Sequence, residues 1–256
     1  MSAVGEFDEG GAGDLSCRRK APWLSVPLVI VCPIRVADCR ELSTVSLKPF
    51  DFDRLFASGA DHTAPDGQYL TVQVDEEWLV LPTGRVIAVE PGISGVAFAQ
   101  TVPPGRYPVL LSVAEHRASS TPDSEIIDER VAAARLVIRG EAVATWEPAV
   151  TAGQDVDDLG DGEFYGYGVD GGTGCFTDAR SYQDLLDDDE IEWGDLLMDV
   201  DDRPTSPTAL TGPDDEPLLV AFTTGCGDGG YPTWVGRTAN GDIACFLTEF
   251  FLIGRS

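Results

Sequence analysis

Two glycine-rich segments each carry one aspartate, and they hold the residue types best suited to chemistry. The first reads VDGGTG at residues 169–174, and the second reads GCGDGGYP at residues 225–232. Glycines let backbone N–H groups approach an anion, and an aspartate can hold a metal ion or activate water. The alternative for each segment is a tight turn whose aspartate accepts local backbone hydrogen bonds. The ligand-binding candidates in and beside these segments are Asp170, Thr173, Asp178, Asp228 and Tyr231.

The carboxylates would lie together if both segments fall at one end of a sheet. Asp170, Asp178 and Asp228 would then offer oxygen ligands of the kind that Ca²⁺ or Mg²⁺ takes. Asp170 and Asp228 are therefore the metal-ligand candidates; the sequence establishes no cofactor and leaves a divalent cation as the candidate. A zinc site is not expected, because the chain has only two histidines and no Cys-x-x-Cys pair. The scarcity of histidine also disfavours a Ser-His-Asp or Cys-His catalytic set.

The charge of the chain limits the partners it can have. Asp and Glu total 44 against 17 Lys and Arg, a formal net charge of −27. Such an excess repels nucleic acids and anionic membrane surfaces, so neither is an expected partner. A block at residues 155–202 holds 17 acidic residues against one arginine. It is either a solvated surface or a docking face for a basic protein, with the acidic run Asp187, Asp188, Asp189 and Glu190 at its centre.

Alternating apolar residues and frequent turns predict many short strands. The expected strands are residues 69–74, 77–81, 85–89, 107–114, 130–139, 218–223, 233–235 and 243–253, and the apolar run at 23–36 suits an edge strand. The Pro-Thr-Gly turn at 82–84 predicts a hairpin between 77–81 and 85–89. Residues 130–139 could also form a helix, since alanines tolerate both periods, but their Val and Ile residues favour a strand that pairs antiparallel with 107–114. Residues 181–197 have helical spacing, and Asp178 is placed to cap that helix.

These elements predict an α+β fold dominated by an antiparallel sheet, as a sandwich or an open barrel-like form, with one or two helices. Residues 1–20 are expected to form an acidic, Gly-rich disordered tail, and residues 21–256 a single compact β-rich domain. No apolar run is long enough to span a membrane, and no signal peptide is visible, so a cytoplasmic location is expected. The six cysteines are scattered, which favours reduced thiols.

Three segments in a fixed order resemble a known family. They are residues 81–114, which include LPTGRVIAVEP and VPPGRYPVLLSVA, then FYGYGVDGGTGCFTD at 164–178, and TTGCGDGGYPTWVGRTANGDIACF at 223–246. Their combination is similar to the bacterial family named domain of unknown function 4241, over roughly residues 77–246. The resemblance implies no established activity.

Two functions of different classes follow from these features. The first is a protein-interaction or immunity-type module that holds a basic protein on its acidic face. The alternative is a metal-assisted hydrolase or small-ligand-binding domain that uses the Asp-bearing glycine loops. Whether the chain is an enzyme stays open at this point, and the geometry of the two loops is the feature that separates the hypotheses.

Overall fold

The computed structural model describes residues 51–64, 67–73, 76–119, 121, 124–160 and 162–253. The predicted tail at 1–20 and the apolar run at 23–36 lie outside these residues. The helices are α1 (Phe52–Leu55), α2 (Ala179–Asp187) and α3 (Trp193–Asp202), with a 3-10 turn η1 at Val156–Asp158. The strands are β1 (Asp61–Ala64), β2 (Gly67–Gln73), β3 (Glu77–Leu81), β4 (Val86–Val89), β5 (Gly105–Arg117), β6 (Ile126–Val137), β7 (Thr145–Pro148), β8 (Gly166–Val169), β9 (Thr173–Asp178), β10 (Thr208–Thr211), β11 (Pro217–Thr223), β12 (Gly229–Arg237) and β13 (Ile243–Glu249).

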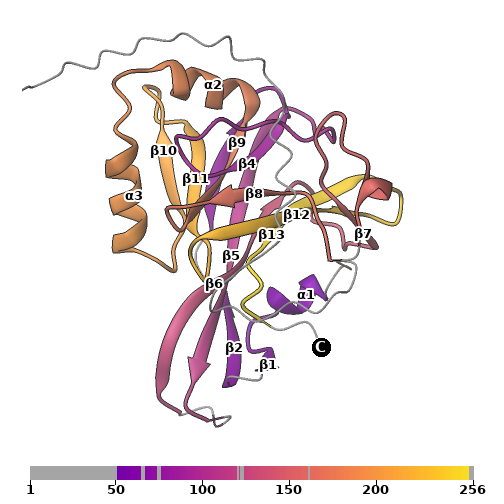
Figure 1. Cartoon of the computed structure of the whole chain (residues 1–256), viewed down its shortest axis with the longest axis vertical. Coiled ribbons are helices and arrows are strands. Elements are labelled where there is room, and N and C mark those ends of the chain that lie inside the picture. The colour runs from indigo at the N-terminus through magenta and orange to yellow at the C-terminus, as the bar shows by residue number, and fades with distance from the viewer. Residues whose placement is uncertain are drawn as a thin grey trace, which may run out of the picture.

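Two antiparallel sheets form the body of the molecule (Figure 1). The larger has nine strands, with β1-β2-β5-β6-β13-β12-β7 in order, while β3 pairs with β5 and β8 pairs with β12. The smaller has the order β10-β11-β9-β4. The prediction of an α+β fold dominated by antiparallel sheet is confirmed. Among the described residues the strands form two sheets and close no barrel.

The smaller sheet is covered on both faces. Successive side chains of a strand point to opposite sides of the sheet, so each strand contributes to two hydrophobic clusters. In β11, Val220 and Phe222 belong to the main core cluster that also contains Phe246 of the larger sheet. Leu219 and Ala221 instead pack in a second cluster with side chains of α2 and α3. The layers are therefore large sheet, small sheet and helices, which explains why residues 218–223 read as an unbroken apolar run.

The predicted helix at 181–197 is two helices separated by a short acidic connection. Asp178 caps α2 as expected, since its carboxylate accepts a hydrogen bond from the Arg180 N–H at 2.9 Å. The chain leaves α2 at Asp188, and α3 begins at Trp193. Tyr182 and Leu185 of α2 are buried on the small sheet with Leu196 of α3, so one apolar stripe continues across both helices.

The predicted hairpin between residues 77–81 and 85–89 is wrong. Both strands exist, but β3 pairs with β5 in the larger sheet and β4 pairs with β9 in the smaller one. Gly84 has a positive φ of 68°, and a side chain there would collide with the backbone of Val102. The turn at 82–84 therefore carries the chain from one sheet to the other instead of closing a hairpin.

The predicted pairing of residues 107–114 with 130–139 is confirmed by the long β5–β6 hairpin, whose register runs from Val109↔Leu136 to Arg117↔Ile126. The expected strands at 218–223, 233–235 and 243–253 correspond to β11, β12 and β13. No helix among the described residues has the length and apolar character needed to cross a membrane. The cytoplasmic location stays a prediction.

Candidate functional site

The two glycine-rich segments meet at one end of the smaller sheet. Thr224 donates its N–H to the carbonyl oxygen of Gly172 at 2.9 Å, which ties the second loop to the first. A Cβ atom added to Gly172 would lie 3.7 Å from the Cα of Gly227, so the two backbones are close neighbours. The register of β8 against β12 pairs Val169 with Gly229 and continues this contact. The metal-site hypothesis required both glycine-rich segments to lie at one end of a sheet, and their backbones do lie together there.

The backbone of the first loop is held by a carboxylate from elsewhere in the chain. The N–H groups of Asp170 and Gly171 donate to the two carboxylate oxygens of Glu90, at 3.1 and 2.6 Å. The Asp170 side chain is exposed. This loop therefore presents two backbone N–H groups to an anion, as its glycines predicted, and in this molecule the anion is Glu90.

Asp178 lies at the opposite end of β9 from Thr173 and is fully buried. Its carboxylate accepts from the Thr83 N–H at 3.0 Å and from the Thr83 hydroxyl at 2.8 Å, in addition to the N–H of Arg180. These bonds join the start of α2 to the turn between the two sheets. The structure thus separates Asp178 from the glycine loops and gives its carboxylate local donors.

The aromatic residues that flank the loops lie inside the core. Tyr231 is 3% exposed and donates its hydroxyl to the Gly227 carbonyl oxygen at 2.7 Å. Burial raises its pKa from 10.0 to about 12. Its ring packs edge-on against Phe250 with 5.2 Å between centroids, and Tyr167 is also buried. These buried side chains pack under the glycine loops and do not line an open pocket.

A shallow hollow of about 220 Å³ opens where the loops meet, and we call it the loop hollow. Strand β6 contributes Glu129 and Arg130 to its lining, and the chain just after α3 contributes Pro204. The Arg130 guanidinium is paired with Asp128 at 2.6 Å. The remaining lining residues are Gly172, Thr223, Thr224, Gly225 and Gly227.

The metal-ligand candidates Asp170 and Asp228 belong to no cluster of potential ligands within the part of the chain that the structure describes. There, no three side chains of the His, Cys, Asp and Glu types gather in a group suited to a metal ion. Asp228 is exposed at the tip of the second loop, and Asp170 is exposed at the tip of the first. Thr173 is buried, with its hydroxyl 3.4 Å from the Gly171 carbonyl oxygen.

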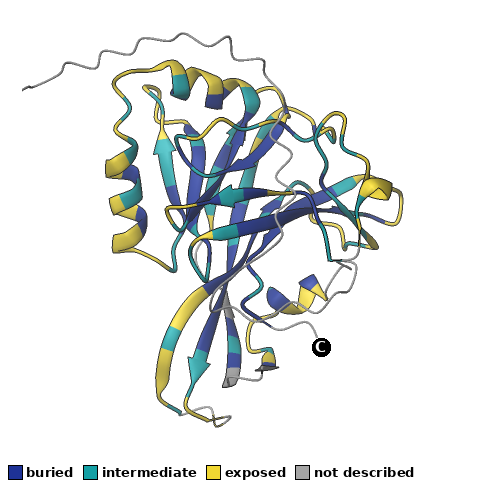
Figure 2. Ribbon diagram, in the orientation of Figure 1, coloured by how far each residue is buried: buried dark blue, intermediate teal, exposed yellow. Residues whose placement is uncertain are grey.

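The acidic run lies on the outer surface of the helices. The exposed carboxylates of α2, α3 and their connection, which we call the acidic face, are those of Asp184, Asp187, Asp188, Asp189, Glu190, Glu192, Asp195, Asp199, Asp201 and Asp202. Figure 2 shows this outer side of α3 as exposed and the side toward the sheet as buried. In the sequence block at 155–202, the acidic residues of η1 belong to a different part of the surface, on the far side of the molecule from α3 (Figure 1).

Compensating cations are scarce on the acidic face. Among the described residues its one ion pair joins Arg180 to Asp184 at 4.0 Å, with both side chains more than 70% exposed. Asp187 accepts a hydrogen bond from Gln183, and Asp188 accepts one from the Glu190 N–H. Met198 stands within the face on α3 and is 66% exposed.

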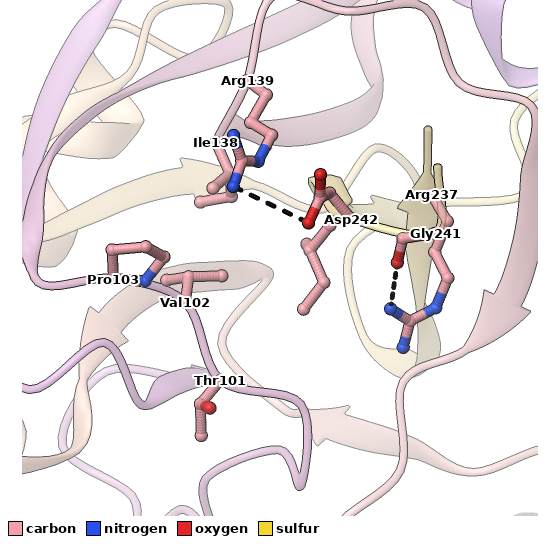
Figure 3. A pocket seen from close by; sticks show the side chains of 9 residues that line it. Thr101, Val102, Pro103, Ile138, Arg139, Arg237, Gly241 and Asp242 are labelled. Atoms are coloured by element: carbon pink, nitrogen blue, oxygen red, sulfur yellow. Dashed lines mark hydrogen bonds and ion pairs between the residues drawn. The ribbon is translucent and has the colours of Figure 1, made fainter. Parts of the chain in front are cut away.

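A second hollow, of about 240 Å³, was not foreseen because its residues are distant in the sequence. Figure 3 shows Asp242 and Gly241 between the side chains of Arg139 and Arg237. Arg139 lies 3.8 Å from Asp242, while Arg237 pairs with Glu147 at 2.6 Å and donates to the Gly241 carbonyl oxygen. Both guanidinium groups are therefore matched by a carboxylate, which leaves the hollow electrically balanced.

The cysteines within the described residues are of two kinds. Cys226 of the second loop is disulfide-bonded, so the expectation of reduced thiols is wrong for this residue. Cys175 and Cys245 are free and buried. Burial raises the pKa of the Cys245 thiol from 9.0 to about 11, and it raises that of Cys175 further. Scattered spacing could not reveal the bond, because a disulfide depends on which cysteines the fold brings together.

Comparison with known proteins gives one match. The model of a family described as protein of unknown function (DUF4241) matches residues 79–248, which extend from β3 to β13 and include both glycine loops and the acidic face. No curated protein and no solved structure matches the chain.

Proposed function

The chain belongs to the DUF4241 family of proteins of unknown function, and we propose that it is an interaction module that binds a basic protein through its acidic face. The observation that carries the proposal is the uncompensated charge of this face. The face holds exposed carboxylates on two neighbouring helices, and the described residues supply a single weak ion pair to them.

Such a surface is unfavourable for the molecule by itself. Like charges repel within the face, and this repulsion is relieved when complementary charges approach. A basic partner would be attracted at a distance and would associate rapidly, while acidic molecules would be excluded. Charge concentrated on one face gives a direction to this attraction that an evenly spread net charge would not give.

Met198 adds an apolar contact to the charged surface. Most large apolar side chains in the described part of the chain are buried, whereas Met198 is 66% exposed on α3, close to Asp195 and Asp199 in the sequence. A flexible methionine adapts to the shape of a partner and contributes affinity that charge alone does not provide. An exposed apolar side chain surrounded by carboxylates is the kind of surface that binds another protein, so we propose a protein as the partner.

The test is an affinity capture from cells that produce the protein, compared with the variant D187N/D188N/D189N. Asparagine keeps the side-chain oxygens that accept from Gln183 and from the Glu190 N–H, so the helices should be preserved. We expect the wild-type protein to enrich a basic protein that the triple variant loses. Raising the salt concentration should weaken the capture, because exposed charges are screened over about 10 Å at 0.1 M salt.

The matched control removes the same number of charges elsewhere. Asp155, Asp157 and Asp158 belong to η1 and its N-cap and are exposed, and D155N/D157N/D158N should capture the basic protein as the wild type does. Equal loss in both triple variants would mean that net charge and not the acidic face is responsible. A captured set unchanged by D187N/D188N/D189N would reject the proposal.

A second candidate function is the binding of a divalent cation or small ligand at the glycine loops. The observation in its favour is the meeting of the two loops at the loop hollow. A thermal-shift titration with Ca²⁺, Mg²⁺ and Mn²⁺ tests it, because a ligand that binds only the folded protein raises the melting temperature. Stabilisation that is lost in both Asp170→Ala and Asp228→Ala would favour this function, and an unchanged melting temperature would count against the cation.

A further inference from the structure

The first half of β6 has a neighbouring strand on one side only. β6 pairs with β5 along almost its whole length, from Ile126 to Leu136. On its other side β13 pairs only with residues from Ala133 onward. Within the described part of the chain no strand continues this pairing past residues 126–130, which we call the free edge.

The free edge is exposed and carries both apolar and charged side chains. Ile126 and Ile127 are 44% and 59% exposed, and they are two of the six large hydrophobic side chains that are exposed in the described part of the chain. Figure 2 shows this half of β6 as an exposed outer strand, below α3. The backbone N–H of Glu129 donates to the Asp128 carboxylate at 3.0 Å, a local bond that an incoming strand can replace. An unpaired strand edge of this kind is a template for an added strand.

The free edge runs into the loop hollow. Glu129 and Arg130 line the hollow on one side, and Pro204, two residues after the end of α3, lines it on another. An extended segment laid along the free edge would therefore pass the hollow and reach the end of the acidic face at Asp201 and Asp202. In such complexes the backbone ladder gives affinity, and hollows beside the ladder select alternate side chains.

We infer that the free edge of β6 binds an extended, basic segment of the partner protein by adding it to the large sheet as an antiparallel strand. This inference rests on the proposed function and specifies the form in which the basic partner binds. Asp128 is already paired with Arg130 of the same edge, so the carboxylates complementary to cationic side chains of such a segment are those of Glu129 and of the end of α3. The loop hollow takes one of those side chains.

Charge also argues against a second copy of this chain as the occupant. Two antiparallel copies centred on Asp128 would set two carboxylates opposite each other, and like charges opposite each other destabilise a sheet, whereas copies centred on Glu129 would pair Asp128 with Arg130 of the other molecule, so the net charge decides. Two molecules of net charge −27 repel each other. A basic strand replaces this repulsion by attraction.

Two synthetic peptides of equal charge separate strand addition from simple charge attraction. The first is acetyl-Arg-Val-Arg-Val-Arg-Val-Arg-amide, whose residues favour a strand. The second is acetyl-Arg-Pro-Pro-Arg-Arg-Pro-Arg-amide, which has the same charge and carries prolines at both odd and even positions, so that N–H groups needed for a ladder are missing on both sides of the strand. Fluorescence anisotropy should show the valine peptide binding about tenfold or more tightly than the proline peptide, because several backbone hydrogen bonds are lost.

Hydrogen exchange of the full chain locates the binding. Without peptide, the amides of residues 126–130 should exchange faster than those of residues 133–137, which are paired on both sides. With the valine peptide, the amides of the free edge should become protected, while the proline peptide should leave them unchanged.

A pair of isoleucine variants provides the control on the protein side. Ile127→Lys places a cation on the free edge, whereas Ile93→Lys makes the same change at a residue that is 54% exposed in the loop before β5. We expect I127K to weaken the binding of the valine peptide by about tenfold and I93K to leave this binding unchanged. The added lysine repels the arginines of the peptide only where it lies beside the bound strand.

Each other outcome overturns the inference in its own way. Equal binding of the two peptides would reject strand addition and leave the charge-based function standing, whereas no binding by either peptide would contradict both. Edge protection that grows with protein concentration would show that a second copy occupies the edge. Protection that is already present and independent of concentration would show that the chain itself covers it.

Discussion

Asp170, Asp178 and Asp228 were predicted together as candidate ligands, but their burial gives them different roles. Asp178 is fully buried among three donors from Thr83 and Arg180, whereas Asp170 and Asp228 are exposed at loop tips. The cap formed by Asp178 was predictable, because an aspartate before a helical pattern is a local signal. Its bond to Thr83, 95 residues away, depends on the fold.

Replacing Asp178 by alanine should destabilise the protein strongly. The change removes the cap of α2 and leaves the N–H and hydroxyl of Thr83, a residue at the surface, without their buried acceptor, which together should cost about 2 kcal/mol of unfolding free energy. Urea unfolding measures this loss. Asp228→Ala is the control and should unfold close to the wild type, and a similar loss in both variants would contradict the assignment of distinct roles.

Cys175 and Cys245, the free thiols among the described residues, should be inert in the folded protein. Burial raises the pKa of Cys245 to about 11 and that of Cys175 further, so at pH 8 both remain protonated, and the thiolate is the reactive form. Iodoacetamide should therefore label them only after denaturation. Cys226 should resist labelling until a reductant is added, since it is disulfide-bonded. Labelling of Cys175 or Cys245 in the native protein at this pH would contradict their burial.

At the scale of elements, local pattern identified strands and long-range pairing decided their neighbours. Residues 77–81 and 85–89 are strands as predicted, but their sheet membership could not be predicted from the turn between them. The crossing at Gly84 depends on the contact with Val102, which a local pattern does not contain. The helix pattern and the run of acidic residues made the acidic face predictable from the sequence. The free edge of β6 was not predictable, because it exists only where β13 stops pairing with β6.

β8 should depend on the absence of a side chain at Gly166. This residue pairs with Pro232, and a Cβ there would fall inside the van der Waals contact of the Tyr231 carbonyl oxygen. Gly166→Ala should therefore separate β8 from β12 and lower the unfolding free energy by about 2 kcal/mol, as overpacking does elsewhere. Gly140→Ala, where no atom lies within 4 Å of the added carbon, should unfold like the wild type. Equal stability of the two variants would show that β8 adjusts to the added methyl group.

At the scale of the whole molecule, buried titratable groups should make the protein sensitive to alkaline pH. Burial raises the pKa of Cys245 from 9.0 to about 11 and that of Tyr231 from 10.0 to about 12. The unfolded chain therefore loses these protons first. Stability should be fully present below pH 9 and should fall as the pH rises to 12, by about 1.4 kcal/mol per pH unit for each group within its range.

Urea unfolding across this pH range measures the decline. Tyr231→Phe removes one of the buried groups with a raised pKa, so its stability should fall less steeply between pH 10 and 12 than that of the wild type. A wild-type stability that stays constant up to pH 12 would contradict the burial of both groups.

The acidic face should lower the stability of the free protein, and this separates a binding role from a structural one. If its carboxylates were kept for folding, D187N/D188N/D189N would be less stable than the wild type. We expect the reverse, because the variant relieves repulsion among neighbouring charges and keeps the hydrogen bonds that Asp187 and Asp188 accept.

The melting temperature in low salt is the measurement, and it should rise in this variant. The difference should shrink in 1 M salt, where the screening length falls to about 3 Å. A lower melting temperature would assign these residues to the fold. A rise together with loss of the basic partner would mean that the molecule gives up stability to keep a surface for binding.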